Sequence, residues 1–345
     1  MAMSDYHASI GDWRGELKRN ERKTRWVIAL FLIIYATVGL LVDTVVLEEM
    51  YYPHVTLEQA FFALITLKVV PYATLLMIGF AIISLLITYA MYDTIMLLGT
   101  DYHEITAETA RNLEEKQLYN VVEEMKIAAG LSYMPKVYII EADYMNAFAS
   151  GYSEKSAMVA ITRGLMQKLD RAEMQAVMAH ELSHIRHHDI KLTLMVAVLT
   201  NILLIVVDVL FYSIVFRRDN NRRDANQLAL IITLLRYILP VITVVLTLFL
   251  SRTREYMADS GSVELMRDNE PMARALLKIN QDYIQHAEQY ANEYGNTAHE
   301  QVRQASYLFD PSSIDPVKSF VNAFSTHPSI EDRLRAIGFK RKTPK

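Results

Sequence analysis

The chain has 345 residues, of which 52% are hydrophobic, a formal net charge of −4 and no cysteine. The weak negative charge and the lack of an arginine-rich or aromatic-interleaved module argue against nucleic-acid binding. Without cysteine there is no disulfide framework and no thiolate ligand, so any metal site must use histidine and carboxylate side chains. The apolar content suits either soluble domains or a membrane protein, and local runs decide between them.

Four long apolar runs predict a multi-pass membrane protein. Each run holds roughly twenty mostly apolar residues, enough to cross a hydrocarbon core of about 30 Å. They cover residues 26–47, 69–92, 193–216 and 228–250. The alternative for each run is a buried helix of a large soluble core.

The polar segment 1–25 predicts the orientation of the first run. Its basic residues crowd the membrane boundary: Arg14, Lys18, Arg19, Arg22, Lys23 and Arg25. The run that follows is too long for a signal peptide and no small-residue cleavage site comes after it, so we expect an uncleaved anchor. The acidic connection 48–68 suits an exported loop, which places the amino terminus and residue 93 onward in the cytoplasm.

Residues 193–250 are expected to form a second membrane hairpin. The connecting loop 217–224 carries four arginines, which conflicts with the positive-inside rule if the loop is exported. A hairpin that dips into the membrane without crossing it is therefore the alternative. Asp208 and Arg236 each lie eight residues from the loop, about 12 Å at the helical rise, so we predict that they pair. Separate snorkelling towards the interface is the other possibility.

The segment between the hairpins indicates a mainly α fold with a small antiparallel β-sheet. A helix is expected over 105–129, ending at Gly130. Asp170 and Glu173 have the spacing of a capping box, which predicts a helix from about Arg171 to His188. Between these helices, β-prone stretches predict three strands, over 136–142, 145–151 and 157–163.

The helix from Arg171 carries the pattern His-Glu-x-x-His. His180 and His184 are four residues apart, so on a helix both imidazoles point the same way and can share one zinc ion. Glu181 is then placed to reach a water molecule rather than the metal, which is what a hydrolase needs. His187 and His188 are expected to be solvated or interfacial, and a second metal bound by them is the less favoured alternative.

A carboxylate from another helix is what this histidine pair lacks, because a catalytic zinc commonly takes three protein ligands. Glu255, shortly after the last apolar run, is the candidate. Asp259, one turn later, could accept the other ring N–H of a ligating histidine. The structural alternative for both acids is ion pairing with Arg252 and Arg254 on the helix surface.

The chain is expected to be organised in four parts. These are a cytoplasmic segment (1–25), a transmembrane hairpin (26–92), a peptidase domain made from 93–192 and 251–345, and a second hairpin (193–250). Within the last part of the domain, an amphipathic helix is expected over 268–293, beginning at Pro271, and an irregular region over 294–320. A short final helix is predicted to begin at Ser329 as its cap.

Several ordered motifs resemble the HtpX-like membrane zinc metallopeptidases, a gluzincin family related to the CAAX prenyl proteases. They are NAFASG (146–151), AITRGL (160–165), HELSHIRHHD (180–189), SRTREYMAD (251–259) and STHPSIEDRL (325–334), placed around two hydrophobic pairs. The likeness covers most of residues 25–340. The departures are the polar amino-terminal extension and a lengthened region around 285–320.

The resemblance implies one Zn²⁺ per chain, bound by His180, His184 and Glu255, with Glu181 as general base. His327 is implied as an electrophilic helper in catalysis, with Asp189, Asp259 and Arg333 orienting the site. The strands are expected to offer an edge to an extended substrate at Asn146, Ala147, Phe148, Ala160, Ile161 and Thr162.

The expected function is a zinc endopeptidase of the cytoplasmic (inner) membrane that acts on unfolded or misfolded membrane proteins in the lipid bilayer, with its active site facing the cytoplasm. Zinc would acidify a water molecule and polarise the scissile carbonyl while Glu181 moves the proton to the leaving amine. An inactive scaffold that retains a structural zinc is the alternative. A metal transporter is disfavoured because Asp43, Asp208 and Arg236 are too few for a cation path.

Overall fold

The computed structural model describes residues 3, 6–8, 13–51, 54–97, 101–151, 153–215, 223–287, 289–290, 308 and 327–341. The chain divides into two compact units. We call them the sheet-bearing unit, made of Met1–Thr24, Tyr89–Leu192 and Leu248–Lys345, and the helical unit, made of Arg25–Thr88 and Thr193–Thr247.

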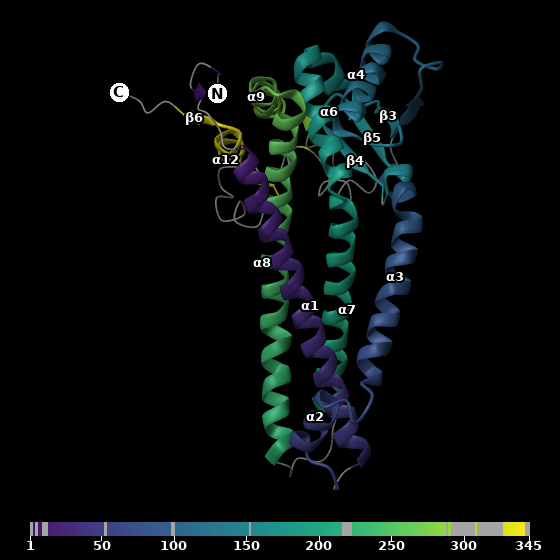
Figure 1. Ribbon diagram of the computed structural model, residues 1–345, viewed down its shortest axis with the longest axis vertical. Coiled ribbons are helices and arrows are strands. Elements are labelled where there is room, and N and C mark those ends of the chain that lie inside the picture. Colours follow the sequence, from purple (N-terminus) through teal and green to yellow (C-terminus); the bar gives the residue numbers. More distant parts are fainter. Residues whose placement is uncertain are drawn as a thin grey trace. The chain divides into compact units, whose positions relative to one another are not determined.

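Parts of four long helices form the helical unit and run side by side (Figure 1). They are α1 (Trp13–Tyr51), α3 (Tyr72–Leu97), α7 (Asp189–Val215) and α8 (Arg223–Met266), and the short α2 (Leu57–Ile65) lies between α1 and α3 in the sequence. Side chains from all four pack together in one core, which includes Tyr35, Val38, Met77, Leu203 and Leu239.

The outer surface of these helices is strongly apolar. Leu76 is 74% exposed and Val209 is 62% exposed, as expected for side chains that face lipid rather than water. Three described helices are long and apolar enough to span a membrane, over Lys18–Tyr51, Val196–Ser213 and Ala229–Met266. The predicted span 69–92 overlaps α3, in which the described side chains form a shorter apolar stretch, Tyr72–Ser84. Length and composition thus support three of the four expected spans.

Two polar contacts tie the helical unit together. The Asp43 carboxylate accepts hydrogen bonds from the Ala73 and Thr74 amides at 2.7 and 2.9 Å and from the Thr74 hydroxyl at 2.6 Å, which satisfies the first turn of α3. The predicted pair in the second hairpin is confirmed, because Arg236 Nε lies 2.9 Å from Asp208 Oδ1. The arginine-rich loop expected between α7 and α8 lies mainly outside the described residues.

The sheet is mixed rather than antiparallel. Its order is β2-β3-β5-β4, with β2 (Tyr102–Ile105), β3 (Lys136–Ile140), β4 (Ala147–Ser150) and β5 (Met158–Thr162). β5 folds back antiparallel to β4 but inserts beside β3, to which it is parallel. The pattern of apolar residues predicts which segments are strands but not their neighbours, which explains the error.

Helices cover the sheet and complete this unit. They are α4 (Leu113–Ala129), α5 (Arg163–Lys168), α6 (Arg171–Arg186), α9 (Glu270–Gln285) and α12 (Ile330–Ala336). The first expected helix is eight residues shorter than predicted, because the Asn112 side chain caps α4 through the Glu115 amide and the chain before it forms a turn closed by the Ala110 amide on the Thr106 carbonyl. A separate ladder pairs β1 (Tyr6–Ala8) with β6 (Phe339–Arg341). The irregular region expected over 294–320 lies outside the described residues, except for Leu308.

Candidate metal centre

Helix α6 carries the His-Glu-x-x-His pattern and begins where the sequence predicts. The Asp170 carboxylate accepts a hydrogen bond from the Glu173 amide, and Glu173 accepts one from the Asp170 amide, both at 2.9 Å, which completes the capping box. α6 packs against α4 on one side and α9 on another. Its central residues are therefore buried, including His180 at 0% exposure and Glu181 at 1%.

The two predicted ligand histidines face one point. Their Nε2 atoms are 3.2 Å apart. Each Nδ1 lies beside a carboxylate, His180 at 3.0 Å from Asp259 Oδ1 and His184 at 2.8 Å from Asp189 Oδ2. A carboxylate at Nδ1 favours the tautomer with its proton there, which leaves the Nε2 lone pair free to bind a metal.

Helix α8 brings Glu255 to the same point. Its carboxylate oxygens lie 3.8 Å from His180 Nε2 and 3.6 Å from His184 Nε2. The approach of α8 to α6 depends on Gly261, since a Cβ atom there would stand 2.8 Å from Ser183 Cβ. The Ser262 hydroxyl of α8 also donates a hydrogen bond to the Ala176 carbonyl of α6 at 2.7 Å and so holds the two helices together.

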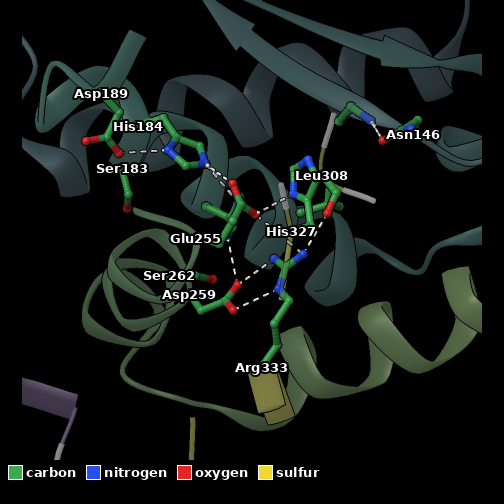
Figure 2. A network of polar contacts seen from close by, with 12 residues as sticks. Asn146, Ser183, His184, Asp189, Glu255, Asp259, Ser262, Leu308, His327 and Arg333 are labelled. Atoms are coloured by element: carbon green, nitrogen blue, oxygen red, sulfur yellow. Dashed lines mark hydrogen bonds and ion pairs between the residues drawn. The ribbon is translucent and has the colours of Figure 1, made fainter. Parts of the chain in front are cut away.

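Residues near the carboxyl terminus close the other side of Glu255 (Figure 2). His327 Nδ1 lies 3.3 Å and Arg333 Nη1 3.6 Å from Glu255 Oε2. Arg333 also donates from Nε and Nη2 to the two oxygens of Asp259, at 2.9 and 2.7 Å. Its helix α12 starts at the predicted cap, where the Ser329 hydroxyl accepts from the Asp332 amide.

Burial and neighbouring charges set the protonation of the site. Burial raises the pKa of the Glu181 carboxyl to about 7, against the lowering effect of His184. Burial lowers the pKa of His180, and Asp259 only partly opposes this. Burial also lowers the pKa of His184, but the Asp189 and Glu255 carboxylates outweigh it and raise this pKa to about 9.

The Arg333 guanidinium adds a fixed positive charge. Although burial favours its neutral form, the carboxylates of Asp259 and Glu255 raise the pKa of Arg333. The side chain is 1% exposed, so its charge acts on Glu255 with little screening by water. This charge helps to keep Glu255 ionised, as a metal ligand must be.

The predicted substrate edge is only partly an edge. β4 lies at the border of the sheet, but β5 is paired on both sides, so Ala160, Ile161 and Thr162 cannot offer a free strand. This part of the expectation is wrong. The Thr162 hydroxyl instead accepts a hydrogen bond from the Asn146 amide at 2.9 Å, and the Asn146 side-chain oxygen accepts from the Ala147 amide at 3.0 Å. Phe148 pairs with Ala160 inside the sheet.

Two contacts of the site were not expected from the sequence. The Arg254 guanidinium donates to the Asp189 carbonyl at 2.7 Å, which joins α8 to the start of α7. Leu308, from the region expected to be irregular, donates its amide to the Ala147 carbonyl at 2.9 Å. The position of Arg254 in the SRTREYMAD motif could have indicated that it lies near the site, whereas nothing in the sequence around Leu308 predicts its contact.

The donor set fits a metal ion. Among the residues that the structure describes, His180, His184 and Glu255 form the one group of acidic and histidine side chains that could hold an ion, with ligand atoms within 4.8 Å of one another. Both nitrogens face the carboxylate, and both rings are held from behind by Asp259 and Asp189. His187 and His188 are not part of this group: His187 caps the end of α6, and His188 is exposed with a φ of 55°.

This combination of a buried two-histidine, one-glutamate site with long apolar helices defines the class of membrane metalloproteases. The chain belongs to peptidase family M48, whose family model matches residues 112–339. The expected HtpX-like resemblance is confirmed by its relatives. The chain is 40% identical over 321 residues to a protease HtpX homolog of Helicobacter pylori (strain Shi470), covering 93% of this chain and 96% of the relative.

A more distant relative covers less of the chain. It is a protease HtpX homolog of Dictyoglomus thermophilum, 34% identical over 282 residues, which are 79% of this chain and 86% of the relative. Among solved structures, the crystal structure of S. mikatae Ste24p aligns with 76% of this chain and 57% of its own, at 18% identity and a TM-score of 0.48.

Proposed function

We propose that the chain is a zinc-dependent endopeptidase that hydrolyses peptide bonds with Glu181 as general base and acid. The proposal rests mainly on the distance between the Nε2 atoms of His180 and His184. Ligands bound at about 2.0–2.1 Å to one tetrahedral zinc ion lie about 3.3 Å apart, and the Nε2 atoms of His180 and His184 are 3.2 Å apart. Glu255 at 3.6 and 3.8 Å completes a set of three ligands.

The proposed chemistry uses the protonation of Glu181. When bound, zinc would polarise the scissile carbonyl and acidify a water molecule. Glu181 would take the proton from this water and return it to the leaving amine. His327, which lies beside Glu255, is proposed to stabilise the negative charge that develops on the carbonyl oxygen, while Arg333 is proposed to orient the site through Asp259 and Glu255.

The experiment combines zinc analysis with a cleavage assay on the purified, detergent-solubilised protein. Casein and an unfolded membrane protein serve as substrates, with and without a chelator. Glu181→Gln is expected to keep zinc and lose cleavage, whereas His180→Ala and Glu255→Ala lose both. Glu264→Gln, on the same helix α8 as Glu255 but paired with Arg186 at the surface, is the control. Wild-type rates for Glu181→Gln would refute the assignment.

An inactive scaffold with a structural zinc is the second candidate. A closed, four-ligand site would favour it. The group of possible ligands within the described residues has three members, which favours the open site of an enzyme. Stoichiometric zinc together with no cleavage of either substrate would support the scaffold.

We further propose that the enzyme lies in the cytoplasmic (inner) membrane with its amino terminus and active site in the cytoplasm, where it removes misfolded membrane proteins. The basic residues before the first span support this orientation. The sheet-bearing unit would be the peptidase domain. Because the chain has no cysteine, a single introduced thiol reports its own side of the membrane. His54→Cys is expected to react with an impermeant reagent from outside, and Lys116→Cys only after lysis.

A further inference from the structure

The free edge of β4 is occupied by a residue from elsewhere in the chain. Among the strands that the structure describes, β4 pairs with β5 alone, on one side. In a strand, the N–H and C=O of alternate residues point to the same side, so Ala147 and Ala149 face the free edge. The Leu308 amide donates to the Ala147 carbonyl at 2.9 Å. Leu308 thus adds to the sheet in the way that an extended peptide does.

The other main-chain group of Leu308 is held by the metal centre. Arg333 Nη1 donates to the Leu308 carbonyl at 2.6 Å and lies 3.6 Å from Glu255 Oε2. Figure 2 shows this carbonyl directed at the guanidinium beside His327. Leu308 therefore connects the strand edge to the same arginine that contacts the candidate ligand.

The side chain of Leu308 is also buried. It is 1% exposed, although the residue belongs to a region that the sequence marks as irregular. A leucine buried at a strand edge, with both main-chain groups bonded beside a metal centre, has the features expected of a bound peptide residue rather than of a surface loop.

We propose that Leu308 occupies the subsite that binds an apolar, leucine-like residue of the substrate. This inference rests on the proposed function and adds a substrate class to it: extended peptides with a large aliphatic side chain, held by Ala147 and Arg333. It follows that the chain competes with its own substrate. A substrate residue at this position makes the same two main-chain bonds, so Leu308 must leave before it binds.

The first test measures binding and needs no catalysis. A labelled peptide with the sequence of residues 303–313 is added to zinc-loaded, full-length protein, and fluorescence anisotropy gives its Kd. Leu308→Asp in the protein removes the internal competitor and is expected to tighten peptide binding about 10- to 100-fold, the range that burial of one leucine side chain provides. The same peptide carrying Leu308→Asp is expected not to bind.

Controls separate the subsite from general destabilisation. Leu113→Asp makes the same change at an exposed leucine, 81% accessible at the start of α4, and is expected to leave peptide binding as in the wild type. Leu308→Ala is a second, milder variant, used where Leu308→Asp loses zinc or unfolds. Equal peptide affinity for the wild type and a folded Leu308 variant would overturn the proposal, as would equal binding of the two peptides.

The second test uses cleavage of a fluorogenic peptide with one leucine. Leu308→Ala is expected to lower the KM and leave kcat unchanged, because it weakens a competitor and not the chemistry. Replacing the leucine of the substrate by aspartate is expected to remove the difference between the variants. Peptide binding without cleavage by any variant would reject the proposed peptidase and retain the subsite. Cleavage with an unchanged KM would reject the subsite and retain the peptidase.

Discussion

The close approach of α8 to α6 at Gly261 gives the sharpest test of how the metal centre is assembled. In Gly261→Ala, the new Cβ atom would stand 2.8 Å from Ser183 Cβ, whereas non-bonded carbon atoms prefer about 3.5–4.0 Å. The two helices must therefore separate by about 1 Å. Ser183 precedes the candidate ligand His184, and Glu255 lies six residues before Gly261 on α8, so the separation would pull the candidate ligands apart.

Overpacking of this size costs about 1–3 kcal/mol. At about 2–4 °C per kcal/mol for a unit of this size, the apparent melting temperature should fall by several degrees. For every 1.4 kcal/mol of this cost that is spent on displacing the candidate ligands, the affinity for zinc falls about tenfold. The assay is a zinc titration of the purified apo-protein in detergent, with thermal unfolding followed in parallel.

Two further variants isolate the contact. Gly79→Ala places a Cβ where no atom lies within 4 Å, so it should leave zinc affinity unchanged. Ser183→Gly removes the opposing Cβ, and the double variant Gly261→Ala with Ser183→Gly should recover zinc affinity relative to the sum of the single changes. Wild-type zinc affinity and melting temperature in Gly261→Ala would refute the packing argument.

Three other predictions concern the stability of the folded protein. Arg163 Nε donates to Glu141 at 3.0 Å, and this hydrogen bond is the main cause that lowers the pKa of Glu141. Arg163→Gln should destabilise the protein at pH 7, by under about 1 kcal/mol for this partly exposed pair and by a further amount for the lost 3.4 Å contact with the buried Glu115. A lowered carboxyl pKa contributes its full stabilisation above the unfolded pKa, about 4.3, and loses it as the pH falls through the lower folded pKa. The difference in apparent unfolding temperature should therefore shrink progressively as the pH falls below about 4. Asp43→Leu leaves the Ala73 and Thr74 amides without their acceptor and should cost about 1–3 kcal/mol, measured by denaturant unfolding in micelles. Removing metal with a chelator should lower the melting temperature of the wild type but not of His180→Ala.

Local signals account for the parts of the site that the sequence predicts well. The Asp170 capping box and the four-residue spacing of His180 and His184 are properties of one helix. They can therefore be predicted from the local sequence without knowledge of the rest of the fold. Glu255 could be proposed because a third ligand of suitable chemistry was needed. Its position beside the histidines depends on the close contact at Gly261, and this contact cannot be predicted from the pattern of residues in the sequence.

Non-local pairing accounts for the errors. The stretches that form β3, β4 and β5 were recognisable by their apolar residues, but the insertion of β5 between β3 and β4 is set by contacts across the sheet. The placement of Ala160 at an edge failed for that reason. Leu308 lacks periodicity around it, so its two main-chain bonds could not be expected from the sequence.

Arg333 links the two halves of the proposed mechanism. It holds Asp259, which holds His180, and it also donates to the Leu308 carbonyl while lying beside Glu255. A guanidinium has a fixed set of donors, so a change in one of these contacts alters the geometry of the others. The candidate ligand Glu255 and Leu308 thus contact the same side chain. Any free energy by which zinc binding changes the proposed release of Leu308 is matched, by linkage, by an equal effect of that release on zinc binding.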